Sequence, residues 1–170
     1  HDGATGAVLR EYVWLGLLPV AYVDHSSGTP ALYYVLADQV GEPQKLTNAG
    51  GAVVWDRVAT PWGQEVSVTG SITQPLRFPG QHNDKETLFA DNWHRTYDPS
   101  LGRYIQSDPI GLLGGISTYG YVGGNPVTRV DPDGLAYGLA LRGAAIGGRM
   151  IGRAAAPHIA RGMVAAGMVA

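Results

Sequence analysis

SDPIGLLGGISTYGYVGGNPVTRVDPDGL, residues 107–135, is the stretch that decides how this chain folds. It carries the pattern Asp-Pro-x-Gly-Leu twice, beginning at Asp108 and again at Asp131. Glycine or proline recurs every few residues, which is turn chemistry rather than the periodicity of a helix or a strand. A segment this irregular has to be held by its own packing and by a surrounding body.

The composition of the chain changes directly after this stretch. All 14 acidic residues lie at or before Asp133, whereas residues 136–170 are rich in Ala and Gly and carry four arginines. Residues 1–135 hold 8 Lys and Arg against 14 Asp and Glu, so the body is acidic and the tail is basic. Such asymmetry indicates two functional units, and the switch suggests a processing site between them.

The chain upstream has the short, punctuated runs of a β structure. The runs 8–24, 31–38 and 45–68 are rich in β-branched and aromatic residues, and Pro19 stands between the one or two strands of the first run. Asn48 to Gly51 is predicted to form a hairpin turn. Repeated strands of this kind indicate a rolled sheet that needs neighbours to bury its face, although an ordinary meander has the same pattern.

Two further segments carry weaker patterns. LFADNWHRTY, residues 88–97, fits either a strand or a short helix. The tail is predicted to be helical from Leu139, with Pro157 ending a first helix and residues 158–170 forming a second. No run in the tail reaches about 18 apolar residues, so a conventional membrane span is not predicted.

Several classes of site are excluded or disfavoured by composition. The chain has no cysteine, which excludes a disulfide scaffold and a thiolate zinc site. His82 near Asp84 and Glu86, and His94 near Asp91, lack convincing ligand spacing, so we predict no metal and no cofactor. The acidic body has no basic stripe, and we expect it to bind no nucleic acid.

The run FPGQHNDKETLFADNWHRTYDPSLGRYIQSDPIGL (78–112), followed by TYGYVGGNPVTRVDPDGL (118–135), closely resembles the RHS-repeat-associated core domain. That domain closes the RHS/YD-repeat proteins, which include bacterial polymorphic toxins and the C components of insecticidal Tc toxins. The resemblance covers about residues 30–135. Leu88 stands where the family usually has Gly, and Asp91 where it usually has Tyr.

The resemblance implies a mainly β fold. Residues 1–75 would be the last strands of a spiralling RHS/YD-repeat sheet that forms a hollow shell, and residues 76–135 an irregular core-domain plug. Residues 136–170 would be the start of a variable C-terminal toxin, with a short α-helical tail. The implied partners are the rest of the shell and the encapsulated toxin, with secretion-spike, chaperone and immunity proteins as further ones. Such a protein is made in the bacterial cytoplasm and is secreted or delivered into target cells, for example as a type VI secretion effector.

Many members of this family cut themselves after the Leu of the second Asp-Pro-x-Gly-Leu segment. The family pattern implies a catalytic pair of aspartates, which here are Asp108 and Asp131, and an orienting arginine, which is Arg95. It also implies a scissile bond, Leu135–Ala136, and a flanking motif that contains Pro132 and Gly134. Arg103 is the rival to Arg95. Gly134 would allow close backbone approach, and Leu135 would anchor in an apolar pocket.

Two carboxyl groups can hydrolyse a peptide bond without a metal. An ionised carboxylate takes a proton from water while a protonated one polarises the carbonyl, and close approach makes the pair share one proton. Purely structural interpretations are also open: Asp-Pro-x-Gly is a common turn sequence, and Arg95 could form a structural ion pair with Asp98 or Asp91. A plug that does not cut, or a YD-repeat cell-surface adhesion module, would then be the function.

Overall fold

The structure, a computed structural model, describes residues 5–139 of the chain. The predicted mainly β fold is confirmed: these residues form twelve strands and two short 3-10 helices. The predicted tail helices lie outside the described residues. No helix within residues 5–139 is long and apolar enough to cross a membrane.

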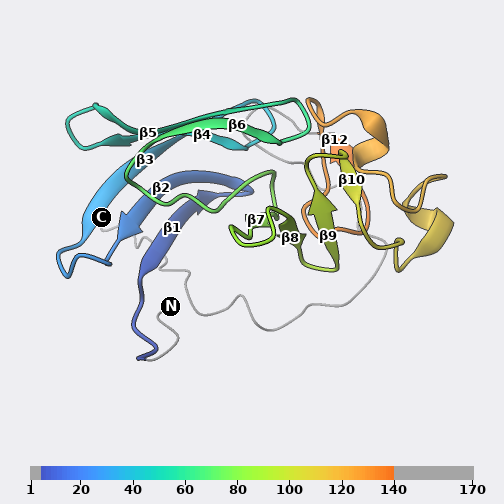
Figure 1. The fold of residues 1–170 in the computed structure, drawn as a ribbon, viewed down its shortest axis with the longest axis horizontal. Coiled ribbons are helices and arrows are strands. Elements are labelled where there is room, and N and C mark those ends of the chain that lie inside the picture. Colours follow the sequence, from blue (N-terminus) through green and yellow to red (C-terminus); the bar gives the residue numbers. More distant parts are fainter. Residues whose placement is uncertain (1–4, 140–170) are drawn as a thin grey trace, which may run out of the picture.

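A six-stranded antiparallel sheet makes up the first half of the described chain (Figure 1). Its strands follow one another in sequence order: β1 (Arg10–Leu15), β2 (Leu18–Asp24), β3 (Ala31–Ala37), β4 (Pro43–Asn48), β5 (Val53–Ala59) and β6 (Glu65–Gly70).

The first predicted run, residues 8–24, therefore forms two strands, β1 and β2. The chain turns at Gly16, whose φ is 63°, and not at Pro19, which lies inside β2 opposite Trp14 beside a register shift in β1. A proline is tolerated there because the ladder is already irregular.

The two faces of this sheet differ in burial. One face packs Tyr22, Val35, Leu46 and Trp55 into a cluster, and the Tyr22 ring stacks between two neighbouring tyrosine rings. The opposite face exposes aliphatic and aromatic side chains along β3 and β5, namely Leu32, Tyr34, Leu36, Val53 and Val58. Within the described residues, β1 and β6 each pair on one side only. The sheet therefore has two open edges and one uncovered apolar face, which strands outside this chain could cover.

A smaller antiparallel sheet carries the second half. It consists of β7 (His82–Asn83), β8 (Ala90–Asn92), β9 (Arg95–Asp98) and β10 (Arg103–Tyr104), in the order β10-β9-β8-β7. Residues 88–97 thus contain a hairpin, β8 paired with β9, and not a helix, and the chain reverses at Trp93, whose φ is 57°. A second core cluster packs against this sheet; its members are Val40, Phe78, Ala90, Tyr97, Tyr104, Tyr121, Val122 and Val130, with Trp62 beside them.

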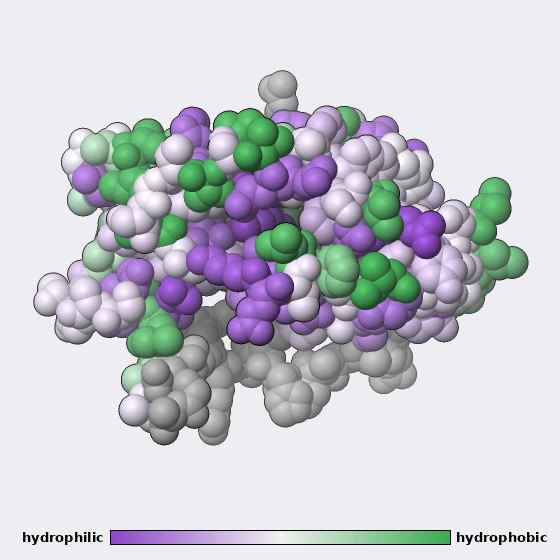
Figure 2. Space-filling view, viewed as in Figure 1, coloured by the Kyte–Doolittle hydropathy of each residue, from purple (hydrophilic) through white to green (hydrophobic). Residues whose placement is uncertain are grey.

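The turn-rich segment is ordered by wrapping this second cluster. It contains the 3-10 helices η1 (Gly111–Gly114) and η2 (Val122–Gly124) and the short strand β11 (Arg129–Val130), which pairs with β12 (Gly138–Leu139). Tyr121 and Val122 are buried in the cluster, so the loop brings its own packing. Figure 2 shows apolar residues projecting at the right-hand end of the molecule, where Figure 1 draws this loop in yellow.

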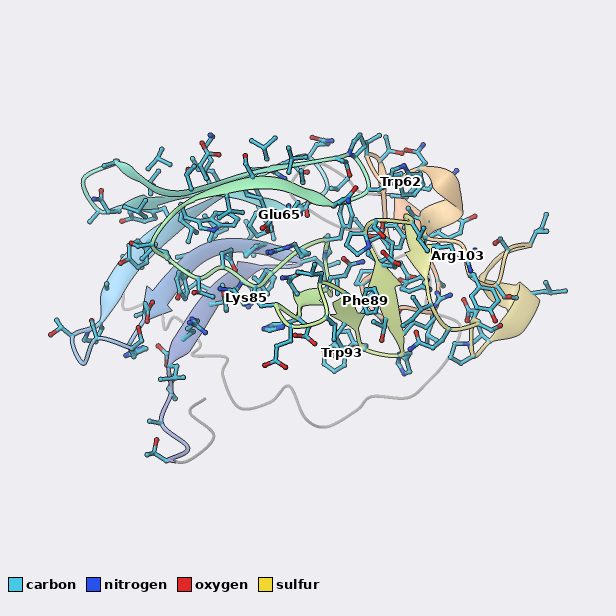
Figure 3. All side chains as sticks on the ribbon, in the orientation of Figure 1. Trp62, Glu65, Lys85, Phe89, Trp93 and Arg103 are labelled. Atoms are coloured by element: carbon cyan, nitrogen blue, oxygen red, sulfur yellow. The ribbon has the colours of Figure 1, made fainter. Side chains whose placement is uncertain are left out.

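Charged side chains tie the larger sheet to the segment that leads to the smaller one. The Arg57 guanidinium on β5 is buried, donates to Glu42 at 2.7 Å and lies 3.7 Å from Glu65. Arg77, in the segment between the sheets, pairs with Glu65 at 3.1 Å. Figure 3 shows Glu65 and Trp62 on the side of the larger sheet that faces the smaller one. The Trp62 carbonyl accepts a hydrogen bond from Tyr97 at 2.8 Å, so the two sheets are held to each other by polar contacts as well as packing.

Candidate active site

The three side chains singled out in the sequence meet in the interior. Arg95 lies on β9, Asp108 just before η1 and Asp131 just after β11. One guanidinium nitrogen, Nη2 of Arg95, is 3.0 Å from Oδ2 of Asp108 and 3.2 Å from Oδ2 of Asp131. All three residues are buried, with at most 8% of their surface exposed. The Gly-rich loop between the aspartates therefore folds back on itself and places both carboxyl groups on one arginine.

The rest of the Arg95 side chain is also fixed. Nε donates to the Gly134 carbonyl and Nη1 to the Thr118 carbonyl at 3.2 Å. The guanidinium carbon lies 3.7 Å from the centre of the Tyr104 ring. Within residues 5–139, the ion pairs of Arg95 are with Asp108 and Asp131, and neither Asp98 nor Asp91 pairs with it. Asp98 instead accepts from Ser100 and Leu101 in its own turn. Arg103, the rival arginine (labelled in Figure 3), is exposed and lies over the Tyr119 ring, whereas the ion pairs of both aspartates within the described residues are with Arg95.

Asp131 is surrounded by hydrogen-bond donors. The Tyr104 hydroxyl donates to its Oδ2 at 2.8 Å, and the Leu135 N–H donates to its Oδ1 at 3.1 Å. Asn92 donates both to the Tyr104 oxygen and to the Asp131 carbonyl. Burial raises the pKa of Asp131, while the bonds from Tyr104 and Arg95 oppose that rise. A carboxyl group with a raised pKa holds its proton closer to neutral pH than an ordinary aspartate does.

Asp108 faces the carbonyl of Leu135. A Cβ placed on Gly114 would stand 2.3 Å from Oδ2 of Asp108 and 2.8 Å from the Leu135 carbonyl oxygen. Both groups therefore border the same small space, which only a glycine leaves open. The other Asp108 oxygen, Oδ1, accepts from the Ile110 N–H at 2.9 Å. The arrangement puts one carboxyl beside the carbonyl of the predicted scissile bond and the other on the N–H of the same residue, Leu135.

The cleavage motif itself passes close to the β8–β9 hairpin. Gly134 has a φ of 72°, and a Cβ there would stand 2.4 Å from the Asn92 carbonyl oxygen. No other residue type fits this approach, since the contact is with main chain. Pro132 makes a similar close approach to Gly80, since a Cβ added to Gly80 would stand 2.0 Å from the Pro132 carbonyl oxygen. Leu135 is partly exposed, and Ala136 is exposed.

Sequence reasoning missed Tyr104, Asn92 and Gly114. Tyr104 pairs with Tyr97 across β9 and β10, two residues along β9 from Arg95, so strand alternation puts its side chain on the Arg95 face. A buried tyrosine usually finds a partner for its hydroxyl, and that signal was available in LGRY. Asn92 and Gly114 gave no signal, because their roles depend on where distant loops return.

The described histidines, His25, His82 and His94, do not assemble a metal site. Among residues 5–139, no group of three or more His, Cys, Asp or Glu side chains is arranged to hold an ion. His82 pairs with Asp91 across β7 and β8, and burial lowers the pKa of its ring. The His94 ring nitrogen Nδ1 lies 2.8 Å from the Asp133 carbonyl oxygen, which fixes the turn after β11.

Comparison with known proteins finds toxins. No family model matches the chain. It is 40% identical over 129 residues to double-stranded DNA deaminase toxin A of Burkholderia cenocepacia, covering 73% of this chain and 9% of that protein. It is 42% identical over 130 residues to the probable deoxyribonuclease RhsB of Dickeya dadantii, covering 75% of this chain and again 9% of the relative. The chain thus spans less than a tenth of the length of these relatives.

A solved structure has the same fold. The crystal structure of TcdB2-TccC3 without its hypervariable C-terminal region matches with a TM-score of 0.64 at 26% identity. The match covers 77% of this chain and 7% of the solved one. Relatives by sequence and by structure therefore agree with the resemblance carried by residues 78–112 and 118–135.

Proposed function

This chain belongs to the RHS/YD-repeat toxins, and on that premise we propose that it cuts itself between Leu135 and Ala136 by an aspartyl-protease mechanism. The observation that carries the proposal is the single Arg95 nitrogen shared by Asp108 and Asp131. The two carboxyl groups hold opposite ends of one residue: Asp131 accepts the Leu135 N–H, and Asp108 borders the Leu135 carbonyl.

The chemistry requires one proton shared by the two carboxyl groups. The ionised group takes a proton from water, whose oxygen bonds to the Leu135 carbonyl carbon, while the protonated group gives its proton to the carbonyl oxygen. When the resulting diol collapses, the bond from carbon to the Ala136 nitrogen breaks and a proton passes to that nitrogen. The products are a Leu135 carboxyl group and an Ala136 amine, and one water is consumed. The pair titrates jointly.

Arg95 serves this chemistry by position and by charge. Two buried carboxylates without a cation would repel each other, and both would hold protons. A buried guanidinium keeps one of them ionised, and its bond from Nε to the Gly134 carbonyl fixes the backbone one residue before Leu135. Since the cut segment is part of the same chain, the reaction turns over once.

We further propose that residues 1–75 end a repeat sheet that encloses the toxin, with residues 76–135 as its plug. The open edges of β1 and β6 and the exposed apolar face of the sheet support this, because a longer repeat sheet would cover them. Residues 136–170 would begin the toxin, held inside until the protein is delivered into a target cell. Its partners would be the remaining shell, the enclosed toxin and the delivery apparatus.

Intact-mass measurement of the full-length protein tests the cut. We expect two chains with the break after Leu135, and a single uncut chain in Asp108→Asn and in Asp131→Asn, since an amide keeps the size but cannot cycle a proton. Asp91→Asn, an exposed carboxylate on β8, is the matched control and should cut as the wild type does. A wild-type chain that remains whole would leave the non-cutting plug as the function.

A further inference from the structure

The segment after the predicted cut is held by a strand that leads into the site. β12, residues 138–139, pairs antiparallel with β11, with Arg129 opposite Leu139 and Val130 opposite Gly138. β11 ends at Val130, and Asp131 follows directly. The main chain that carries one catalytic carboxyl therefore also carries the peptide that leaves. Addition of a strand to a free edge is a common way of binding an extended peptide.

Arg129, Gly123 and Gly115 form a surface beside this ladder, called the shelf below, against which the Tyr137 ring lies. The Arg129 guanidinium lies 5.1 Å from the centre of the Tyr137 ring. Two glycines border the ring: a Cβ on Gly123 would stand 3.0 Å from the Tyr137 hydroxyl, and one on Gly115 would stand 3.9 Å from its Cε1. The same Gly123 Cβ would stand 2.7 Å from Nη1 of Arg129. Larger side chains at Gly123 would therefore displace both the arginine and the tyrosine.

We propose that β11, with the shelf formed by Arg129, Gly123 and Gly115, is a binding subsite for the extended peptide that follows the scissile bond, and that it selects an aromatic residue two positions after the cut. The proposal rests on the proposed cleavage and adds its leaving-side subsite. Tyr137 is a positioning residue: it touches neither carboxyl group. It fixes the far side of the scissile bond while Arg95 and Asp131 fix the near side.

The subsite has a consequence for the product. Hydrolysis breaks only the bond between Leu135 and Ala136. Strand β11 precedes this bond and strand β12 follows it, so the cut leaves their pairing intact. Residues 138–139, two positions after the new amino terminus at Ala136, therefore stay paired with β11 after the cut. The cleaved toxin would remain anchored at its first residues for as long as this ladder and the Tyr137 contact persist.

The first test measures the rate of cutting. Full-length protein is made by cell-free translation, and intact and cut chains are quantified over time. We expect Tyr137→Ala to slow cutting by about three- to tenfold, in line with the loss of a half-exposed cation–π contact and its ordering effect, and Tyr137→Phe to restore most of the rate. Tyr119→Ala is the matched control, because Tyr119 is as exposed as Tyr137, both at 40%, and also lies under an arginine. Equal rates for Tyr137→Ala and a wild type that cuts would overturn the proposal.

The second test needs no cutting. In the full-length Asp108→Asn protein, amide hydrogen exchange of residues 136–139 should be slow, and Tyr137→Ala should speed it several-fold while Tyr119→Ala leaves it unchanged. Exchange of this segment at the rate of an unstructured peptide would overturn the subsite. If the wild type never cuts but the segment is protected and depends on Tyr137, the proposed function fails and the subsite stands.

Discussion

The hydroxyl of Tyr104 donates a 2.8 Å hydrogen bond to Oδ2 of Asp131, the same oxygen that lies 3.2 Å from the Arg95 guanidinium. Tyr104 also accepts from Asn92 at 2.7 Å and presents its ring to Arg95. Burial raises the pKa of Tyr104 well above the ordinary tyrosine value, so its hydroxyl keeps its proton and donates at neutral pH. Tyr104 thus orients both the carboxyl group and the cation of the proposed dyad.

Replacing Tyr104 by Phe should slow cutting and move its pH profile to higher pH. The bond from Tyr104 lowers the pKa of Asp131, so its loss raises that pKa further. The limb of the profile that reports Asp131 then moves upward whether this carboxyl acts as acid or as base. We expect a rate loss of about tenfold, the effect of about 1.4 kcal/mol in the barrier. Rates of self-cutting between pH 5 and 9, in full-length protein, measure both effects.

The control for this substitution is Tyr97→Phe. Tyr97 is buried in the same aromatic cluster, with its ring 5.9 Å from that of Tyr104, but its hydroxyl donates to the Trp62 carbonyl. It should leave the pH profile in place. A profile that shifts equally in both variants would assign the effect to packing and not to the bond with Asp131.

Gly114→Ala should block the reaction without straining the backbone. The new Cβ would stand 2.3 Å from Oδ2 of Asp108 and 2.8 Å from the Leu135 carbonyl oxygen, so the carboxyl group must move away from the scissile bond. A displacement of about 1 Å costs roughly a hundredfold in rate. Gly50→Ala is the control, since a Cβ there meets only Asn48 at 3.4 Å, an ordinary contact. Unchanged cutting by Gly114→Ala would show that the position of Asp108 beside the Leu135 carbonyl is not needed for the reaction.

The sequence was sufficient to predict the β fold, and its motifs singled out Arg95, Asp108 and Asp131, whose side chains meet in the structure. Their part in a cleavage reaction stays a prediction. The strand boundaries were less predictable: Pro19 looked like a break, yet the chain turns at Gly16, since a proline fits beside an irregular ladder. The LFADNWHRTY run stayed ambiguous because its hairpin depends on Trp93 adopting a positive φ.

The parts of the site that escaped prediction are those set by long-range contacts. Asn92 reaches Asp131 across 39 residues of sequence, and Gly114 matters only because Leu135 returns beside it. Tyr137 is a similar case: it lies in the segment that resembles no family, and its contact with Arg129 exists only once β11 and β12 pair. Loop closure of this kind leaves no local pattern in the chain.

The buried ion pair between Arg57 and Glu42 should matter more for stability than the exposed pair between Lys45 and Asp56. Glu42→Ala leaves Arg57 in the interior with only Glu65, at 3.7 Å, to compensate it, and should cost about 3 kcal/mol. Asp56→Ala removes the partner of Lys45 at the surface, where both side chains are about one-third or more exposed, and should cost under about 1 kcal/mol. The free energy of opening of β4 and β5, from amide exchange in the full-length protein, compares the two. Similar costs would mean that water reaches Arg57.

The cut tail should stay with the body in high salt. Residues 136–170 carry four arginines and no acid, a net of +4, against 8 basic and 14 acidic residues in 1–135, a net of −6. If charge alone held them together, about 1 M salt would release the tail, because the Debye length falls to about 3 Å.

We expect enclosure and the β11–β12 ladder to hold the tail, so size-exclusion chromatography in about 1 M salt should give one peak that contains both chains. Denaturant should separate them, since it opens the shell. A tail that elutes separately from a folded body in salt would show that the association is electrostatic and that the body does not enclose it.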